Sequence, residues 1–413
     1  MLPHTEQILA ESLPVSNTTN QPQLRSKLQV PWEIASDRRS KSMKIIYLAR
    51  RAIPSVHAHS VQIVKMSEAF GKLGHEVLLL AHPGDDDPPH VYSRYGVDPA
   101  FSIECFPPRT KTLLRKWRFG AFLLRHPQVR SADLFFGRDI FSLAIASTLG
   151  KPVIFEAHAM PKGKLARTLL GRLFASRNFS HLVCVTSTLA DSFRESFKSL
   201  AGKAVVVVPN GATECKAGPD LVAWPGRPRT TQVGFIGRPF VGKGIELMVG
   251  AAQRMPGCDF HVVGADKSDV AWIGTDFPPN LHFHGYQPHA RLGAYQRRFD
   301  VAVAPYCAQV MNASERESAS ITSPLKLLEY MAAGLPVIVS DLPGVRDILG
   351  AENIATLVPP GDVDALVGAL QRLAEDPELR RKLGAAARQS YLERHTLIAR
   401  ARRVLEPALA ATD

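Results

Sequence analysis

The sequence is poor in the features that mark several specialised classes of protein. Its 413 residues contain five cysteines and no CxxC pair. This scarcity argues against a disulfide framework and against a zinc site, so no metal is expected. No apolar run approaches the roughly 18 residues that a membrane-spanning helix needs. The first residues lack the charged start and apolar run of a secretory signal, so we expect a cytoplasmic protein.

The charge is unbalanced but not gathered in one block. Lysine and arginine outnumber aspartate and glutamate by 50 to 38, which gives a formal net charge of +12. A basic excess favours anionic partners, such as phosphorylated small molecules or an acidic lipid surface. Residues 109–118 (RTKTLLRKWR) mix basic side chains with Leu and Trp, as membrane-surface helices do. No nucleic-acid-binding module is recognisable, so we expect no nucleic-acid partner.

From Met43 onward, apolar runs alternate with stretches of helical periodicity. Residues 44–49 (KIIYLA) and 76–81 (EVLLLA) predict two buried strands. Between them, Ser60 is predicted to cap a helix that ends at Gly74. A strand, a helix and a strand in succession form a βαβ unit, which implies a parallel sheet covered by helices.

The same alternation continues to the end of the chain. Further strands are predicted at 152–158, 181–187, 204–209, 232–237, 259–264, 300–305 and 336–341. A polar, proline-rich joint at 217–231 separates two such series. We therefore predict an α/β protein with two doubly wound, Rossmann-like domains facing a cleft. The predicted divisions are a poorly ordered tail (1–42), an N-terminal domain (43–225), a C-terminal domain (226–394) and a final helical segment (395–413).

Ligands of open parallel sheets bind beyond the carboxyl ends of the strands. The first such loop, residues 49–60, carries Arg51, His57 and His59 and leads into a helix start that can receive anions or sugar hydroxyls. It can equally be an ordinary loop between a strand and a helix. Glu156 and His158 end the strand at 152–158, where a histidine can hydrogen-bond sugar oxygens or shuttle protons, or can be structural.

A second candidate loop lies in the C-terminal half. The stretch 234–244 (GFIGRPFVGKG) places Arg238 and Lys243 between a strand and a helix. An arginine fork and a lysine point charge among glycines suit a diphosphate. The alternative is a solvated surface loop. No G-x-G-x-x-G follows the first strand, which argues against an NAD-dependent dehydrogenase.

Residues 320–341 are the most informative segment. Thr322 and Ser323 are predicted to cap a helix whose start receives phosphate. Lys326 and Glu329 lie three residues apart and share a helix face, so they can form a simple salt bridge. In the functional interpretation, Glu329 binds ribose hydroxyls and Lys326 adds positive charge.

From Met43 to about Leu409, the ordered segments resemble the GT-B-fold glycosyltransferases of family 4. The segments that carry the resemblance are LGHEV (73–77), FEAH (155–158), VTSTL (185–189), VPNGA (208–212), GFIGRPFVGKGIE (234–246), HFHGYQP (282–288), DVAVAPY (300–306) and LLEYMAAGLPVIVSD (327–341). The resemblance implies an acceptor-side N-terminal domain, a donor-side C-terminal domain and a last helix that crosses back to the first.

The implied activity is retaining, metal-independent transfer of a sugar from a UDP-, GDP- or ADP-linked donor to a glycan, lipid-linked or small-molecule acceptor, at the inner face of a membrane. It makes His158, Arg238 and Lys243 the catalytic residues. The donor-binding residues would be Arg238, Lys243, Gly264, Thr322, Ser323, Pro324, Leu325, Lys326 and Glu329. The acceptor or sugar side would hold Arg51, His57, His59, Glu156 and His158.

The sequence departs from the family pattern at one informative position. Ile321 stands where the family often has a glutamate that contacts the donor sugar, and Glu315 or Glu317 could substitute for it. Two alternatives therefore stay open. One is a nucleotide-sugar epimerase or hydrolase of the same fold, and the other is a non-catalytic nucleotide-sugar-binding subunit.

Overall fold

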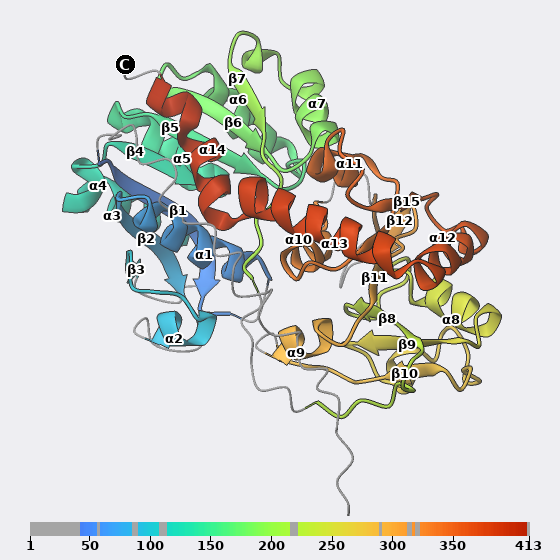
Figure 1. Cartoon of the computed structure of the whole chain (residues 1–413). Coiled ribbons are helices and arrows are strands. Elements are labelled where there is room, and N and C mark those ends of the chain that lie inside the picture. The colour runs from blue at the N-terminus through green and yellow to red at the C-terminus, as the bar shows by residue number, and fades with distance from the viewer. Residues whose placement is uncertain are drawn as a thin grey trace, which may run out of the picture. The chain divides into compact units, whose positions relative to one another are not determined.

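The computed structural model describes residues 42–55, 58–84, 90–106, 114–214, 222–288, 291–311, 316–318 and 323–410. Apart from Ser42, the predicted N-terminal tail lies outside the described residues. Residues Ser42–Asp413 form one compact unit. Within its described parts, two parallel sheets confirm the predicted α/β class of two doubly wound domains (Figure 1).

The first sheet contains seven parallel strands within the described residues, in the order β3-β2-β1-β4-β5-β6-β7. Its strands are β1 (Lys44–Ile53), β2 (Glu76–Pro83), β3 (Ser102–Cys105), β4 (Leu134–Gly137), β5 (Val153–Ala157), β6 (Phe179–Cys184) and β7 (Ala204–Val207). The chain builds the sheet outward from β1 to one edge and then restarts at β4 on the other side of β1. The strand order therefore reverses between β1 and β4.

The second sheet repeats this plan with six described strands, in the order β10-β9-β8-β11-β14-β15. They are β8 (Thr231–Ile236), β9 (Cys258–Val263), β10 (Leu281–Phe283), β11 (Val301–Ala304), β14 (Val337–Ser340) and β15 (Thr356–Val358). Here the order reverses between β8 and β11. A separate antiparallel pair, β12 (Gln309–Met311) and β13 (Arg316–Ser318), follows β11.

Helices cover both faces of each sheet. The helices that accompany the first sheet are α1 (Ala58–Lys72), α2 (Val91–Tyr95), α3 (Leu114–Arg125), α4 (Pro127–Arg130), α5 (Ile140–Ala146), α6 (Lys164–Ala175) and α7 (Ser187–Ser196). Those that follow β8 in the chain are α8 (Ile245–Arg254), α9 (Leu292–Gln296), α10 (Leu325–Ala332), α11 (Pro343–Leu349), α12 (Val363–Glu375), α13 (Pro377–Ser390) and α14 (Leu397–Ala410).

The pleat of the first sheet sends alternate residues into two separate cores. Ile46 and Phe155 face the core that contains α5, α6 and α7. Ile45 and Ile154 face the opposite core, which contains α1 and α14. Successive side chains of a strand point to opposite faces, so Glu156 lies on the α14 side of β5.

Helix α14 (red in Figure 1) packs on the first sheet, although it is the last helix of the chain. Val404 and Leu405 lie in the same core as α1. The buried ring of His181 on β6 fixes the helix further, because its Nε2 lies 2.9 Å from the carbonyl oxygen of Val404. The end of the chain therefore contributes side chains to the interior of the first sheet.

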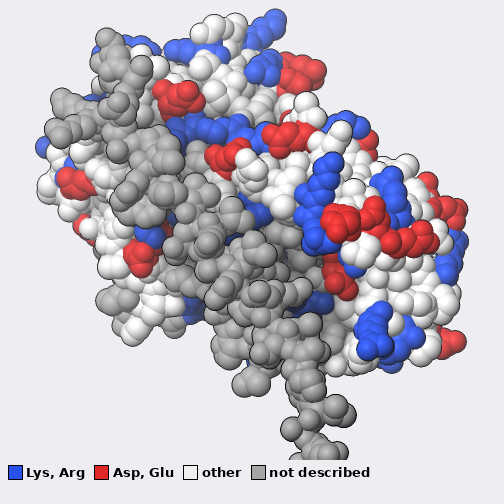
Figure 2. Space-filling view, in the orientation of Figure 1, with Lys and Arg blue, Asp and Glu red and all other residues white. Residues whose placement is uncertain are grey.

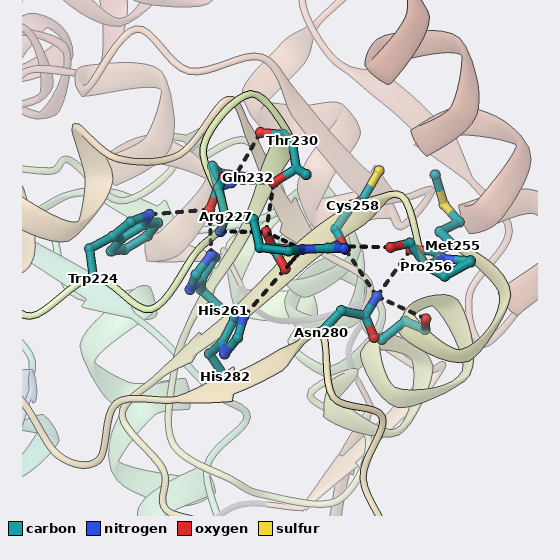
Figure 3. A network of polar contacts seen from close by, with 12 residues as sticks. Trp224, Arg227, Thr230, Gln232, Met255, Pro256, Cys258, His261, Asn280 and His282 are labelled. Atoms are coloured by element: carbon teal, nitrogen blue, oxygen red, sulfur yellow. Dashed lines mark hydrogen bonds and ion pairs between the residues drawn. The ribbon is translucent and has the colours of Figure 1, made fainter.

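Polar contacts anchor the segment before β8 to the second sheet (Figure 3). The Arg227 N–H and the Thr230 hydroxyl donate to the buried Asp259 carboxylate at 2.8 and 2.6 Å. The Trp224 indole stacks on His261 with ring centroids 4.0 Å apart. Residues 224–230, which precede β8, thus pack with the second sheet.

Two predicted details of the first strand and helix are wrong. Strand β1 continues to Ile53, so part of the predicted loop at 49–60 is extended strand. Helix α1 begins at Ala58, and Ser60 does not cap it. The Ser60 hydroxyl instead donates to the carbonyl oxygen of Ala52, which ties the helix to the end of β1.

Candidate functional site

The loops at the reversal point of the second sheet carry several predicted site residues. Ligands of open α/β sheets bind beyond the carboxyl ends of the strands at such a point. Residues 237–244 follow β8, Gly264 follows β9, and Tyr306 follows β11. These three strands are neighbours in the sheet, so their carboxyl ends meet at one edge.

Glycines allow these loops to approach one another closely. Gly244 and Gly264 have φ angles of +96° and +110°, where side chains are strained. A Cβ on Gly264 would lie 2.5 Å from the carbonyl oxygen of Gly237, and one on Gly244 would lie 2.4 Å from that of Pro305. The loops after β8, β9 and β11 are therefore packed backbone against backbone.

Two predicted cations lie on the loop after β8. The Phe240 N–H donates to the carbonyl oxygen of Arg238 at 2.9 Å, and the Lys243 N–H donates to that of Phe240 at 3.0 Å. These turns keep Arg238, which is exposed, and Lys243, which is half-buried, on one short loop. The Lys243 ammonium lies 5.5 Å from the centre of the Tyr306 ring, within reach of a cation–π contact.

Lys326 and Glu329 lie beside this loop. Their side chains form the ion pair that the sequence left open, with Nζ and Oε2 2.6 Å apart. The Glu329 side chain is 11% exposed. Burial raises the pKa of Tyr306, and the negative charge of Glu329 raises it further. The Ile236 N–H at the end of β8 donates to the Tyr330 hydroxyl of α10 at 2.8 Å, so the Lys326–Glu329 pair and the Lys243 loop lie at the same edge of the sheet.

The prediction that Ser323 caps the helix is wrong. Helix α10 begins at Leu325, and Pro324 stands at the capping position without a side-chain hydrogen bond. The Ser323 hydroxyl instead accepts the Asn210 backbone N–H at 3.0 Å, and its carbonyl oxygen accepts from the Asn210 amide at 3.2 Å. Thr322 and Ile321 lie outside the described residues. Pro324 thus supplies no side-chain cap to the first N–H groups of α10.

A buried cluster of charge lies at the carboxyl ends of β4 and β5. Glu156 Oε2 accepts from Arg138 Nε at 2.9 Å, and Glu156 Oε1 lies 3.1 Å from His158 Nε2. Arg400 of α14 donates to Glu156 Oε1 and also, at 2.9 Å, to the carbonyl oxygen of Pro209. The side chains of Glu156 and Arg400 are 0% and 1% exposed.

The surroundings fix the protonation states of this cluster. Burial alone would raise the pKa of Glu156, but Arg138, Arg400 and His158 hold it well below its usual range. Burial, followed by the charge of Arg138, lowers the pKa of His158 to about 4, although Glu156 opposes the shift. At neutral pH, Glu156 is therefore a carboxylate and His158 is neutral. The Nε2–H of that neutral ring then donates to Glu156.

This burial corrects the role predicted for Glu156. A side chain with no exposed area cannot contact an acceptor, and the Glu156 carboxylate instead contacts His158, which is 31% exposed. Neither Arg138 nor Arg400 is predicted as a site residue from the sequence. The signal for Arg138 was its place directly after the short apolar run LFFG, which forms β4.

The remaining predicted residues add few described contacts to the loops of the second sheet or to the cluster around Glu156. His57 and the side chain of Arg51 lie outside the described parts of the chain, and His59 is half-buried in the first turn of α1. No three or more His, Cys, Asp or Glu side chains among the described residues are arranged to hold a metal ion. Within the same residues, none of the helices combines the length and the apolar character needed to cross a bilayer.

Two family profiles match the chain. The profile described as "Glycosyltransferase Family 4" matches residues 59–213, and that described as "Glycosyl transferases group 1" matches residues 230–376. A phosphatidyl-myo-inositol mannosyltransferase of Mycolicibacterium smegmatis is 26% identical over 79% of this chain and 83% of its own length. A 2-deoxystreptamine N-acetyl-D-glucosaminyltransferase of Streptomyces fradiae is 31% identical over 40% of this chain and 38% of its own.

Solved structures share the same fold. A sucrose-phosphate synthase from Thermosynechococcus elongatus is 19% identical with a TM-score of 0.64, over 90% of this chain and 100% of that one. Anabaena Alr3699/HepE in complex with UDP is 14% identical with a TM-score of 0.65, over 89% of this chain and 100% of that one. These likenesses agree with the expected GT-B fold.

Proposed function

This chain belongs to family 4 of the glycosyltransferases, and from that premise we propose that it transfers a sugar with retention of anomeric configuration, binding its nucleotide-sugar donor at the second sheet. The relatives support transfer, and none of those named above supports the epimerase, hydrolase or non-catalytic alternatives. The observation that carries the site assignment is that Lys243 and the Lys326–Glu329 pair lie at one edge of the second sheet, where its strand order reverses.

We propose a division of tasks within that site. Glu329 binds the ribose hydroxyls, while Lys243, Arg238 and the start of α10 bind the diphosphate. When the bond between the sugar C1 and the phosphate oxygen breaks, negative charge develops on the leaving diphosphate. A preorganised donor aimed at such charge typically contributes about 3 kcal/mol. In this proposal, the Lys243 ammonium and the start of α10 supply such hydrogen-bond donors at one edge of the second sheet.

The acceptor side of the reaction is assigned to the first sheet. The acceptor hydroxyl oxygen forms the new bond to C1 on the face that the diphosphate leaves, and its proton passes to the departing phosphate oxygen. His158 does not become a covalent nucleophile. Because its Nε2–H is held by Glu156, its Nδ1 is the atom suited to accept a hydrogen bond from a sugar or acceptor hydroxyl.

We propose that no divalent cation is required. In this assignment, Arg238 and Lys243 supply the positive charge that a metal would otherwise bring to the diphosphate. Transfer is therefore expected to proceed at an unchanged rate in EDTA. A rate that depends on added Mg²⁺ or Mn²⁺ would contradict the assignment.

The names of similar proteins suggest substrates. Anabaena HepE has been solved with UDP-glucose, which makes a UDP-linked sugar the first donor to test. The Mycolicibacterium relative is named for a phosphatidylinositol acceptor, which favours a glycolipid or cell-envelope glycan and a protein working at the inner face of the membrane. Lys and Arg are interspersed with Asp and Glu among the coloured residues of Figure 2.

Donor binding and turnover test the proposed site. A thermal-shift screen with UDP-, GDP- and ADP-sugars identifies the base, because a ligand that binds the folded state raises its apparent stability. Lys243→Ala and Glu329→Ala should each weaken donor binding or turnover at least tenfold, which is about 1.4 kcal/mol. Lys267→Ala and Glu375→Ala remove exposed charges and serve as matched controls. Wild-type kinetics in both site variants would refute the assignment.

A further inference from the structure

Arg138 and His158 stand at the position where the first sheet reverses its strand order. Arg138 directly follows β4, and His158 directly follows β5. Strand β4 pairs with β1 on one side and with β5 on the other. The two side chains therefore occupy the carboxyl-end edge where open α/β sheets bind their ligands.

These two residues are the accessible part of the buried charge cluster. Glu156 and Arg400 are 0% and 1% exposed, whereas the Arg138 side chain is 15% exposed and that of His158 is 31% exposed. Both exposed side chains bind the same buried carboxylate, so their heads lie side by side. A ligand that reaches this cluster meets a guanidinium group next to an imidazole ring.

Among the described side chains that contact Glu156, positive charge exceeds negative charge. Two guanidinium groups, Arg138 and Arg400, share the single carboxylate of Glu156. The buried Nη1 of Arg400 has no hydrogen-bond partner among the described residues. An uncompensated positive charge in a largely buried site favours an anionic ligand.

We propose that Arg138, with His158 beside it, binds an oxyanion carried by the acceptor, so that the natural acceptor has a phosphate or carboxylate close to the hydroxyl that receives the sugar. An arginine fork matches either group. His158 contributes a hydrogen-bond acceptor for that hydroxyl. This assignment rests on the proposed function, since it describes the acceptor side of the same reaction.

Binding of inorganic phosphate, measured by calorimetry on the full chain, tests the proposal without knowledge of the acceptor. The wild type should bind phosphate at two sites, one at Lys243 and one at Arg138. Arg138→Gln should weaken the second site at least tenfold and leave the first unchanged, and Lys243→Gln should do the reverse. Arg402→Gln removes an exposed arginine of α14 and should change neither.

The variants separate two kinds of failure. If Arg138→Gln binds phosphate like the wild type, the acceptor proposal is overturned whatever Lys243→Gln does. If only Lys243→Gln binds like the wild type, the donor site is wrong while the Arg138 site stands. Should Arg138→Gln fail to fold, Arg138→Lys keeps the charge and loses the fork. It should then bind phosphate several-fold more weakly, and unchanged affinity would overturn the proposal.

Vesicle sedimentation distinguishes a lipid phosphate from a soluble one. The wild type and Arg138→Gln are compared on vesicles of phosphatidylglycerol and of phosphatidylcholine. If Arg138→Gln loses binding to phosphatidylglycerol alone, the oxyanion belongs to a lipid. If both proteins sediment equally with either lipid, while the variant has lost the calorimetric phosphate site, the oxyanion belongs to a soluble acceptor.

Discussion

Replacing Arg400 with methionine should both destabilise the first sheet and slow sugar transfer. Methionine keeps much of the buried aliphatic stem and removes the guanidinium group. Glu156 then loses one of its two guanidinium partners, and the carbonyl oxygen of Pro209 loses its donor. Within the described parts of the chain, Arg138 and His158 remain to hold the carboxylate.

The contacts set the size of the effect. Removing one partner of a buried ion pair typically costs about 3–5 kcal/mol, because the other charge is left uncompensated. Arg138 still binds Glu156, so the lower end of that range, about 3 kcal/mol, is expected. One kcal/mol shifts the melting temperature of a domain of about 150–250 residues by about 2–4 °C. Arg400→Met should therefore melt about 6–12 °C below the wild type.

Scanning calorimetry of the full chain measures this shift. Arg402→Met changes the neighbouring exposed arginine of the same helix and should stay within about 0.5 kcal/mol of the wild type. The double variant Arg400→Met/Glu156→Gln should lose less stability than the sum of the two single changes, because it removes the carboxylate that Arg400→Met leaves underpaired.

Kinetics separate the role of Arg400 in the site from its role in folding. In the proposed scheme, Arg400 acts on the reaction through the acceptor-side cluster and not at the donor site. Its loss should therefore lower kcat while the donor KM stays unchanged, at a temperature where the variant is folded. A melting temperature equal to that of Arg402→Met, or a loss confined to donor affinity, would refute this reasoning.

Three further predictions follow from other parts of the fold. Gly264→Ala places a Cβ 2.5 Å from a backbone oxygen at φ +110° and should weaken donor binding at least tenfold, measured by thermal shift. Burial lowers the pKa of His261 to about 3 and that of His284 to about 4, against about 6.5 when unfolded. The stabilisation from these neutral rings is then fully present above about pH 6.5 and falls towards pH 4, by up to about 1.4 kcal/mol per pH unit for each ring. A melting temperature that stays constant from about pH 6.5 to pH 4 would contradict this prediction. Asp347→Ala removes the carboxylate that accepts the Ser187 N–H at 2.7 Å, and should cost about 1 kcal/mol in urea denaturation, whereas Asp347→Asn should cost less.

The longer strands could be predicted from the sequence, and several short ones could not. The run at 76–81 lies within β2, and that at 259–264 matches β9, because buried parallel strands are nearly continuous apolar runs. Strand β4 is only four residues long and lies between helices, so its apolar run resembles helix-core sequence. The cap assigned to Ser60 failed because the hydroxyl found a tertiary partner, the carbonyl oxygen of Ala52.

Most of the predicted donor residues lie in two short segments of the chain, which is why local sequence patterns could predict them. Lys326 and Glu329 are one helical turn apart, and Arg238 and Lys243 share one loop. The prediction of Ser323 as a helix cap failed because its hydrogen-bond partner, Asn210, lies 113 residues earlier in the chain. The sequence showed that Ser323 precedes a helix, but it could not show that another segment uses its hydroxyl.

The acceptor side could not be read from the sequence, because its partners are brought together only by the fold. Arg400 and Glu156 are 244 residues apart and meet because α14 covers the face of β5 to which Glu156 points. A histidine at the end of a strand predicts chemistry at His158, but the sequence pattern predicts a ligand contact for the carboxylate of Glu156 equally well. Burial decides between these roles: the two arginines retain Glu156 as an internal anion, and their remaining positive charge is directed to whatever binds beside His158. Because two arginines share one buried carboxylate, we expect the acceptor to be an anion.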